Sequence, residues 1–405
     1  MKVLFAVSEC VPFIKSGGLA DVAGSLPKEL TKQGTEVRII LPKYGNIPAL
    51  YKNKTKKIAE FVVAVGWRNQ YCGIEVLELN DITFYFVDNE YYFKREQLYG
   101  YDDDGERFAY FNRAVLEALA QLDYYPDIIH CHDWHTGMIP FLLRVHYQKR
   151  SGYELIKTVF TIHNLHFQGV FPKEAIHDLF GLGFEYYRED QLKYYDCINF
   201  MKGAIVAADQ ITTVSPTYRD EILTDYFGEG LNGLLQERKD RLIGILNGID
   251  EDVYHPEKDA TIYQAFHSEQ WLLKKENKAY LQKIFDLKID RNTPIVAMIT
   301  RLTTQKGMDL IERVFHEMMQ ENVQFILIGT GDVAFENFFR RMEANYGKKC
   351  KCYIGFNEEV AHQVYAGADL FLMPSKFEPC GLGQLIAMKY GAIPIVRETG
   401  GLNDT

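Results

Sequence analysis

The sequence of 405 residues lacks the features of a membrane or exported protein. No apolar run approaches the ~20 residues that a membrane-spanning helix needs. The apolar run at the N-terminus is short and ends at Ser8-Glu9-Cys10, without the small-residue cleavage site of a secretory signal. We therefore expect a protein without a membrane segment, acting in the cytoplasm.

A disulfide framework and an excess of positive charge are also missing. The seven cysteines are scattered, and their odd number fits a reducing compartment. Cys350-x-Cys352 lacks the spacing of a zinc or redox pair. The net charge of −10 argues against nucleic acid as the main partner. It does not exclude a small anionic ligand, because local fields can oppose the net charge.

What the sequence does contain is a glycine turn after its first apolar run. Val3–Val7 predicts a buried strand and the residues from Leu19 onward predict a helix, so Gly17-Gly18 lies between the two. Glycines and the free N–H groups of a helix start let an anion approach the backbone closely. Lys15 adds a positive charge. We favour a diphosphate as the ligand; a plain tight turn with a solvated lysine is the alternative.

The same Gly-Gly-Leu-x-Asp pattern returns near the other end of the chain. Gly400-Gly401-Leu402-Asn403-Asp404 follows Ile393–Val396, which is a second buried-strand pattern. Two similar strand-to-helix turns in two halves indicate two related α/β domains. We place these domains at residues 1–245 and 246–405.

Strand patterns alternate with helical patterns along most of the chain, which predicts parallel sheets with right-handed crossovers. Residues 57–90 differ, since their alternating β-branched and aromatic residues predict an antiparallel excursion. Residues 172–200 are aromatic and charged, and we expect short helices there. Parallel sheets bind ligands beyond the carboxyl ends of their strands, so polar residues at those ends are the candidates for function.

Two strand ends in the first half carry histidines and a tryptophan. His130–His135 holds His, Cys and Asp side chains that are potential metal ligands, but neighbours that leave a strand point in different directions and no second ligand pair is apparent. We favour Asp133 and Trp134 as a sugar-lining loop over a metal site, with turn capping as a further alternative. His163-Asn164 also follows a strand, and a hydrogen bond from His163 to a sugar is plausible. A structural strand-end histidine is the alternative.

The second half supplies positive charges and a carboxylate at comparable places. Arg301 and Lys306 follow a predicted strand and can bind a diphosphate, Arg through a planar fork of donors and Lys as a point charge. Glu378 precedes a predicted helix and can accept hydrogen bonds from sugar hydroxyls or act as an N-terminal helix charge. Gly329-x-Gly331 lacks the third glycine of a dinucleotide fingerprint, which argues against NAD.

Together these motifs resemble the family of bacterial glycogen synthases and plant starch synthases. In chain order the matching segments are Lys15–Val22, His132–His135, Thr161–Asn164, Asn247–Asp250, Arg301–Gly307, Ser375–Leu382 and Arg397–Leu402. The resemblance implies an α/β GT-B fold, in which two Rossmann-like domains with parallel sheets face each other across a deep cleft. It also implies transfer of glucose from ADP-glucose to the non-reducing 4-OH of an α-1,4-glucan such as glycogen, with anomeric retention and with no metal or cofactor.

The resemblance implies roles for individual residues as well. Those implied as catalytic are His163, Arg301, Lys306 and Glu378. Those implied to bind the donor are Lys15, Gly17, Gly18, Asp21, Asn164, Asn247, Gln305, Phe356, Cys380, Gly381 and Leu382. Asp133 and Trp134 are implied on the acceptor side. Phe356 stands where the family often has a tyrosine against adenine, so it keeps the stacking surface and loses the hydroxyl.

Two expectations concern the mechanism and the end of the chain. We find no carboxylate nucleophile for a double displacement, so the acceptor is expected to attack on the leaving-group face. The sequence stops at Thr405, so the helix that Gly400-Gly401 should introduce is expected to be absent, and such a chain would bind ADP-glucose yet close poorly. The alternatives are an impaired glucan- or nucleotide-sugar-binding relative, another GT-B transferase, or a phosphorylase.

Overall fold

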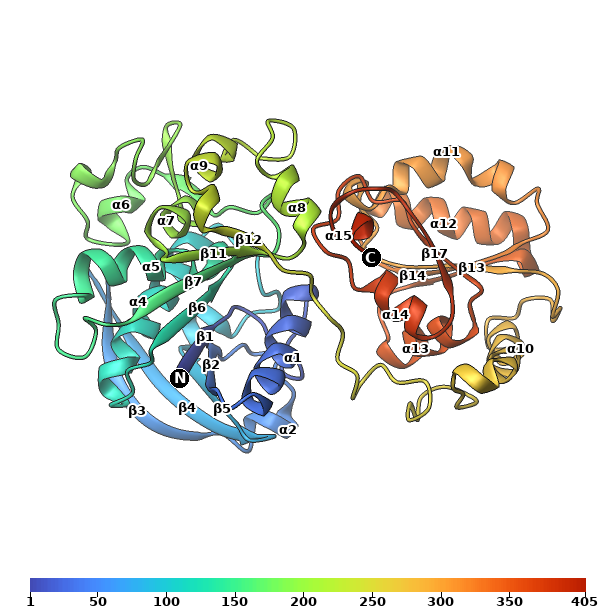
Figure 1. Cartoon of the computed structure of the whole chain (residues 1–405), viewed down its shortest axis with the longest axis horizontal. Helices are drawn as coiled ribbons and strands as arrows, with labels where there is room; N and C mark the ends of the chain where they lie inside the picture. The colour runs from blue at the N-terminus through green and yellow to red at the C-terminus, as the bar shows by residue number, and fades with distance from the viewer. The chain divides into compact units, whose positions relative to one another are not determined.

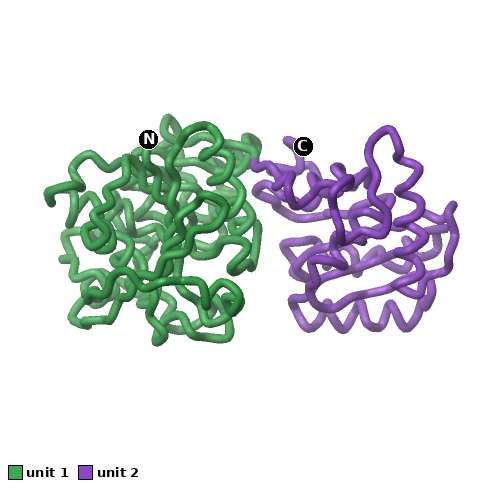
Figure 2. The backbone as a smooth tube through the Cα atoms, turned by 90° about the horizontal axis from the view of Figure 1, so that it is seen from below, with its two compact units in different colours: residues 1–246 green, residues 247–405 purple.

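The computed structural model describes residues 1–405, which divide into two compact units. Unit 1 is Met1–Leu246 and unit 2 is Asn247–Thr405 (Figure 2). Each unit is built on its own sheet with helices packed against it (Figure 1).

Unit 1 contains a nine-stranded sheet in the order β12-β11-β7-β6-β1-β2-β5-β4-β3. The parallel strands are β1 (Lys2–Ala6), β2 (Glu36–Pro42), β5 (Ile82–Asp88), β6 (Ile128–His132), β7 (Lys157–Ile162), β11 (Gln210–Thr213) and β12 (Leu242–Gly244). At one edge β3 (Lys56–Val65) and β4 (Arg68–Leu79) run antiparallel. This confirms the antiparallel excursion predicted for residues 57–90.

Nine α-helices connect the strands of unit 1 or pack beside them. They are α1 (Gly18–Lys32), α2 (Ala49–Lys52), α3 (Glu90–Phe93), α4 (Asp104–Gln121), α5 (Met138–Leu142), α6 (Ala175–Asp178), α7 (Phe200–Ala207), α8 (Pro216–Glu221) and α9 (Asn232–Glu237). Consecutive residues of α4, among them Phe108, Tyr110 and Phe111, are fully buried, as expected of a helix enclosed by the core. No helix of residues 1–405 combines the length and the apolarity needed to cross a membrane.

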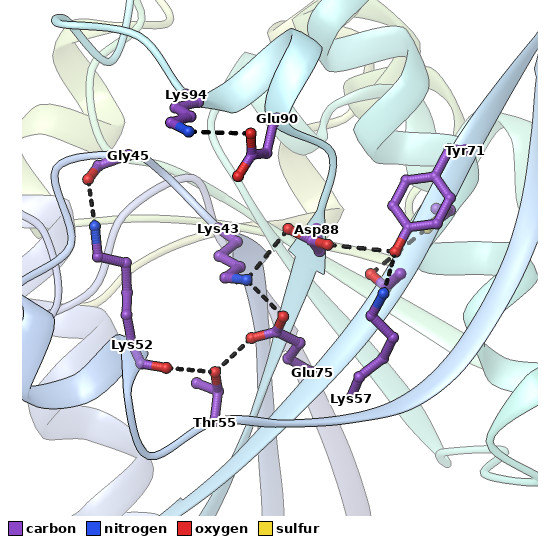
Figure 3. A network of polar contacts seen from close by, with 12 residues as sticks. Lys43, Gly45, Lys52, Thr55, Lys57, Tyr71, Glu75, Asp88, Glu90 and Lys94 are labelled. Atoms are coloured by element: carbon purple, nitrogen blue, oxygen red, sulfur yellow. Dashed lines mark hydrogen bonds and ion pairs between the residues drawn. The ribbon is translucent and has the colours of Figure 1, made fainter.

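A polar network ties the antiparallel edge to the parallel part of this sheet (Figure 3). Lys43, directly after β2, donates to Glu75 on β4 over 2.5 Å and to Asp88 at the end of β5 over 3.3 Å. Thr55 donates to the other carboxylate oxygen of Glu75. Glu75 is 8% exposed, so its negative charge is balanced inside the fold by Lys43. The contacts of Lys43 with Glu75 and Asp88 link the end of β2 to β4 and to the end of β5.

A small antiparallel sheet stands where only short helices were predicted. Its order is β8-β10-β9, with β8 at Val170–Pro172, β9 at Lys193–Tyr194 and β10 at Cys197–Asn199. The prediction for residues 172–200 is therefore wrong in part, since only α6 and a 3-10 turn at Phe184–Tyr186 are helical there. Strands of two or three residues are too short for a period of two to show in the sequence.

Unit 2 contains a five-stranded parallel sheet in the order β15-β14-β13-β16-β17. Its strands are β13 (Ile295–Ile299), β14 (Gln324–Gly329), β15 (Cys350–Ile354), β16 (Leu370–Met373) and β17 (Ile393–Val396). Its helices are α10 (Lys274–Ile284), α11 (Met308–Met318), α12 (Val333–Tyr346), α13 (Glu358–Gly367), α14 (Gly383–Lys389) and α15 (Gly400–Asn403). The alternation of strands and helices is the one that the sequence predicted.

Two hydrophobic cores lie on the two faces of the sheet of unit 2. Val296 and Met298 of β13 belong to the core with α11 and α12, whereas Ile295 and Ala297 belong to the core with α10, α13 and α14. Figure 1 shows these two groups of helices on opposite sides of the sheet. After β17, Gly400 begins a single helical turn, α15, so the first turn of the helix that was expected to be absent is formed.

Candidate functional site

In unit 1 the predicted site residues follow three neighbouring strands. β1 leads into the loop of Lys15 and Gly17, β6 leads to Asp133, and β7 leads to His163. These strands are adjacent in the order β7-β6-β1 and run parallel. Their carboxyl ends therefore share one edge of the sheet, which is where such sheets bind ligands.

The glycine loop is held by a buried carboxylate that the sequence did not indicate. Glu9 is 5% exposed and accepts hydrogen bonds from the amide and the hydroxyl of Ser16, the latter over 2.9 Å. Burial raises the pKa of Glu9 to about 7, although hydrogen bonds from Ser16 and Gly17 act in the opposite direction. The only available signal was an acidic residue just after an apolar strand. Glu9 fixes the backbone directly before the Gly-Gly turn.

The Gly-Gly turn is open around its first glycine. Gly17 precedes α1, has an extended backbone with φ −161°, and has no atom within 4 Å of the place of a Cβ. Lys15 lies 2.7 Å from Asp21 of α1, and both side chains are partly exposed. The structure thus brings Lys15, Gly17, Gly18 and Asp21 together at a helix N-terminus, where backbone N–H groups favour an anion.

Asp133 braces the loop that carries His163. Its Oδ1 accepts hydrogen bonds from the amide of His163 over 2.8 Å and from the amide of Asn164 over 3.4 Å. Its φ of +54° is uncommon for a residue other than glycine. Burial raises the pKa of Asp133 to about 7, and the two amides act against that rise. Asp133 therefore supports the backbone of His163 and Asn164.

His163 belongs to a row of three shielded histidines. His132 Nδ1 and His163 Nε2 are 3.0 Å apart, and the rings of His130 and His132 stack with 4.1 Å between centroids. Burial lowers the pKa of His130 and of His163 to about 3 and also lowers the pKa of His132. All three rings are therefore neutral at pH 7.

The contact between His132 and His163 decides which nitrogen of His163 carries the proton. His132 Nε2 is buried without a hydrogen-bond partner, and a buried N–H without an acceptor is rarer and more costly than an acceptor without a donor. We therefore assign the proton of His132 to Nδ1, which donates to His163 Nε2. The proton of His163 is then on Nδ1, so His163 has an N–H to donate to a ligand.

The potential metal ligands between His130 and His135 do not converge. His130 Nε2 lies 2.6 Å from the hydroxyl of Thr161, His132 contacts His163, and Asp133 accepts backbone amides. Among residues 1–405 no group of three or more His, Cys, Asp or Glu side chains is arranged to hold a metal ion.

Trp134 is a packed side chain with a small accessible part. It is 8% exposed, and its ring meets Phe108 edge-on at 5.0 Å and Phe171 at 5.7 Å between centroids. Gly169, with φ +65°, passes so close to the ring that a Cβ there would lie 2.4 Å from it. Glycine is required at this position, because the loop after β7 lies directly against the indole.

A depression of about 480 Å³ lies beside Trp134 on unit 1. Its lining residues are Tyr101, Asp104, Trp134, His166, Phe167, Gln168, Gly169, Val170, Phe171, Tyr194 and Glu229. They come in part from the loop after β7 and from β8 and β9 of the small sheet. Sequence reasoning missed this depression because it missed that sheet.

In unit 2 an ion pair joins two of the predicted residues. Lys306 Nζ lies 2.5 Å from Glu378 Oε2, and the Ser375 hydroxyl donates to the same oxygen over 2.8 Å. The two charged side chains are 16% and 7% exposed. The loops are also joined where the amide of Lys376 donates to the carbonyl of Gln305 over 2.8 Å. Residues 72 positions apart thus form one polar cluster at the carboxyl edge of the sheet.

The loop of Glu378 is packed against the second Gly-Gly turn. A Cβ at Gly400, where φ is +47°, would lie 2.0 Å from the carbonyl oxygen of Glu378, and one at Gly401 would lie 2.1 Å from that of Cys380. The amide of Gly401 donates to the Glu378 carbonyl over 3.0 Å. The two glycines therefore serve close backbone packing, which fixes the loop from Glu378 to Leu382.

The remaining predicted residues of unit 2 fall into two groups. The thiol of Cys380 is buried, its pKa is raised to about 12 by that burial, and Asn247 lies within hydrogen-bond reach of it. Phe356, in contrast, is 60% exposed. Arg301 is also exposed, and its guanidinium has no hydrogen bond or ion pair among residues 1–405. Lys306 is therefore held by the protein, whereas Arg301 is available to a ligand.

Two family models match the chain. One, described as the starch synthase catalytic domain, matches residues 2–237, and the other, described as glycosyl transferases group 1, matches residues 281–405. Glycogen synthase of Anoxybacillus flavithermus is 61% identical over 405 residues, which are 100% of this chain and 84% of that protein. Glycogen synthase of Geobacillus thermodenitrificans is 60% identical with the same coverage.

Solved structures are similar too. The catalytic domain of starch synthase IV from Arabidopsis thaliana, bound to ADP and acarbose, has a TM-score of 0.93 and 36% identity, covering 100% of this chain and 84% of that one. Sucrose-phosphate synthase from Thermosynechococcus elongatus, with a TM-score of 0.60, 17% identity and coverage of 100% and 82%, shares the fold alone. The GT-B fold is thereby confirmed, and the chain belongs to the family of bacterial glycogen synthases and plant starch synthases.

Proposed function

We propose that this chain transfers glucose from ADP-glucose to the non-reducing 4-OH of an α-1,4-glucan such as glycogen, in the cytoplasm and with anomeric retention. The observation that carries the proposal is the 61% identity to a glycogen synthase over the whole chain. The likeness to a starch synthase bound to ADP and acarbose supports a nucleotide of the same kind as the leaving group.

We assign donor binding to charged side chains and to accessible backbone in both units. Gly17 admits a phosphate close to the backbone, and Lys15, ordered by Asp21, supplies a positive charge next to it. Arg301 and Lys306 neutralise the diphosphate. Further donor contacts are assigned, as the family resemblance implies, to Gly18, Asn164, Asn247, Gln305, Phe356, Cys380, Gly381 and Leu382.

The transferred glucose is assigned to His163 and Glu378. Glu378 Oε2 already accepts from Lys306 and Ser375, so Oε1 is the oxygen left for a sugar hydroxyl. The N–H at His163 Nδ1 donates a hydrogen bond to a sugar oxygen. Because Asp133 and His132 hold His163 from its backbone and from its ring, this donor is preorganised before the substrate arrives.

Negative charge grows on the diphosphate as the bond from the anomeric carbon to the phosphate oxygen breaks. Arg301 and Lys306 stabilise the leaving group most at that point, which lowers the barrier. The acceptor 4-oxygen forms its bond to the anomeric carbon on the same face, and its proton passes to the departing phosphate. Isolation of a covalent glucosyl–enzyme would contradict this single-face reaction.

The test is incorporation of labelled glucose into glycogen by the 405-residue chain. Radiolabelled ADP-glucose and UDP-glucose are supplied in parallel with a chelator present, and a Glu378→Gln variant is the matched control. We expect label in the polymer from ADP-glucose, with a large loss in the variant. Incorporation from UDP-glucose alone would indicate another GT-B transferase. Binding of glycogen without incorporation from either donor would indicate an impaired glucan-binding relative.

A further inference from the structure

The hydroxyl of Ser16 stands at the Gly-Gly turn, and the proposed reaction does not use it. Ser16 directly precedes Gly17 and is exposed, and its hydroxyl bonds only to the carboxylate of Glu9. We propose that Ser16 is a further binding residue for the donor diphosphate, and that a proton taken up by Glu9 turns the Ser16 hydroxyl toward a phosphate oxygen. The inference rests on the proposed function for the place of the diphosphate.

Both oxygens of the Glu9 carboxylate are directed at Ser16. Oε1 accepts a hydrogen bond from the Ser16 hydroxyl over 2.9 Å, and Oε2 accepts one from the Ser16 amide. An ionised carboxylate can only accept, so the hydroxyl proton of Ser16 points at Glu9 while Glu9 is charged. A phosphate beside Gly17 then meets the lone pairs of the Ser16 oxygen and not its O–H.

A proton on Oε1 of Glu9 reverses this hydrogen bond. The protonated carboxyl donates from Oε1 to Ser16 Oγ, while Oε2 still accepts from the Ser16 amide. The Ser16 O–H can now donate to a phosphate oxygen, as a hydrogen bond to a charged acceptor. The proton comes from solvent, and one negative charge behind the turn is removed.

No positive side chain balances the charge of Glu9. Glu9 is 5% exposed and forms no ion pair with a lysine, arginine or histidine. The titratable groups that interact with it from the neighbouring elements are Asp21 of α1, Tyr44 after β2, Tyr99 before α4 and Asp133 after β6. Lys15 is paired with Asp21, and Arg107 of α4 is paired with Asp104. A diphosphate at the turn adds negative charge to this acidic surrounding, which favours the protonated carboxyl.

Binding of the donor is thereby coupled to the uptake of a proton. Burial already raises the pKa of Glu9 to about 7 in the free protein, and the charge of the diphosphate raises it further. Because the bound protein then keeps the proton to a higher pH than the free protein, the affinity for the donor rises as the pH falls from 8.5 to 6.5.

Titration calorimetry with ADP-glucose, without a glucan, measures this coupling. The diphosphate of ADP-glucose has no group that titrates between pH 6 and pH 9, so a proton taken up there is bound by the protein. Binding heats in two buffers of different ionisation enthalpy give the number of protons taken up. We expect an uptake of about half a proton at pH 7.5, and about fivefold tighter binding at pH 6.5 than at pH 8.5 from Glu9 alone.

Glu9→Gln separates the share of Glu9 from that of other groups. The amide of Gln can donate to Ser16 Oγ as the protonated carboxyl does, and its oxygen can accept from the Ser16 amide. We therefore expect this variant to lose the fivefold change with pH and to bind tightly at pH 8.5. Glu75→Gln is the matched control, because Glu75 is also buried in unit 1 but is paired with Lys43. It should keep the pH dependence of the unchanged chain.

Ser16→Ala tests the hydroxyl itself. We expect its affinity for ADP-glucose to fall about fivefold at pH 6.5, where the hydroxyl faces the phosphate, and to change little at pH 8.5, where the hydroxyl faces Glu9. Ser16→Thr keeps the hydroxyl and should restore the dependence on pH. A residue that only shaped the loop would give the same loss at both pH values, which would contradict the proposal.

The outcomes separate this inference from the proposed function. Equal proton uptake by the unchanged chain and Glu9→Gln, in a chain that incorporates glucose into glycogen, would overturn the inference alone. Proton uptake that Glu9→Gln removes, in a chain that binds ADP-glucose and incorporates no glucose, would support the inference and contradict the proposed function. A chain that does not bind ADP-glucose at either pH would overturn both.

Discussion

Gly17-Gly18 in unit 1 and Gly400-Gly401 in unit 2 both stand between a parallel strand and a helix, within the same Gly-Gly-Leu-x-Asp pattern. Around Gly17 no atom lies within 4 Å of the place of a Cβ, whereas a Cβ at Gly400 would lie 2.0 Å from the carbonyl oxygen of Glu378. At Gly17 the absence of a side chain leaves the backbone accessible to a ligand. At Gly400 the absence of a side chain lets the backbone of Glu378 pack against the turn. A repeated motif thus marks equivalent places in two sheets without marking equivalent contacts.

The strongest test of this comparison is Gly400→Ala. The new Cβ meets the Glu378 backbone, and φ is +47°, so the loop must move or the helical turn must break. We expect unit 2 to lose about 4 kcal/mol of unfolding free energy, measured by urea unfolding, and activity to fall with the displaced Glu378.

Gly17→Ala is the matched control for that variant. Its extended φ suits alanine and its Cβ meets nothing, so the unfolding free energy of unit 1 should change by under about 1 kcal/mol. The KM for ADP-glucose should nevertheless rise. Equal destabilisation by the two substitutions would contradict the difference in packing around the two turns.

One lysine in each unit extends the comparison. Lys306 is 16% exposed and pairs with Glu378, whereas Lys15 is 31% exposed and pairs with Asp21. Lys306→Met leaves the Glu378 charge with only a hydroxyl partner, and we expect a loss of about 3 kcal/mol. Lys15→Met should cost under about 1 kcal/mol. Both variants should bind ADP-glucose more weakly, which titration calorimetry would measure.

After Gly400→Ala and Lys306→Met, the next largest effect is the pH dependence of stability that Glu9, beside the first turn, provides. Folded Glu9 has a pKa of about 7 against an ordinary 4.5, so folding retains a proton that the unfolded chain loses. Its contribution to stability is complete below pH 4.5 and is lost as the pH rises through 7, about 2 kcal/mol between pH 5 and pH 8.

Glu9→Gln cannot ionise and should lack this part of the pH dependence in urea unfolding of unit 1. Asp133 remains in both proteins, and its pKa, also raised to about 7, adds a slope of the same sign to each. Only the difference between the two profiles therefore reports Glu9. Parallel profiles from pH 5 to pH 8 would contradict the assignment.

The sequence predicted the parallel strands and the side chains at their carboxyl ends. A short apolar run between helical patterns has few interpretations, and the residues that follow it, such as Asp133, His163 and Lys306, must lie at the sheet edge. The sequence could not predict which of these side chains contact one another. Such contacts depend on loop paths, and Lys306 and Glu378 are 72 residues apart.

Two further features could not be predicted from the sequence, for different physical reasons. The support of Ser16 by Glu9 depends on how the loop after β1 folds back, which no periodicity records. The small sheet of β8, β9 and β10 has strands of two and three residues, so it leaves no alternation to detect. The depression beside Trp134 was missed because one of its walls is this sheet.

The outermost strand of unit 1, β3, has a consequence for solubility. It pairs only with β4, so its other side presents ten residues of edge backbone that a second chain could extend into an aggregate. Its exposed positions include the apolar Ile58 and Val62, but these alternate with Lys56 and Glu60. Any strand that pairs with β3 must desolvate the charges of Lys56 and Glu60. This cost opposes the association of further chains along the edge.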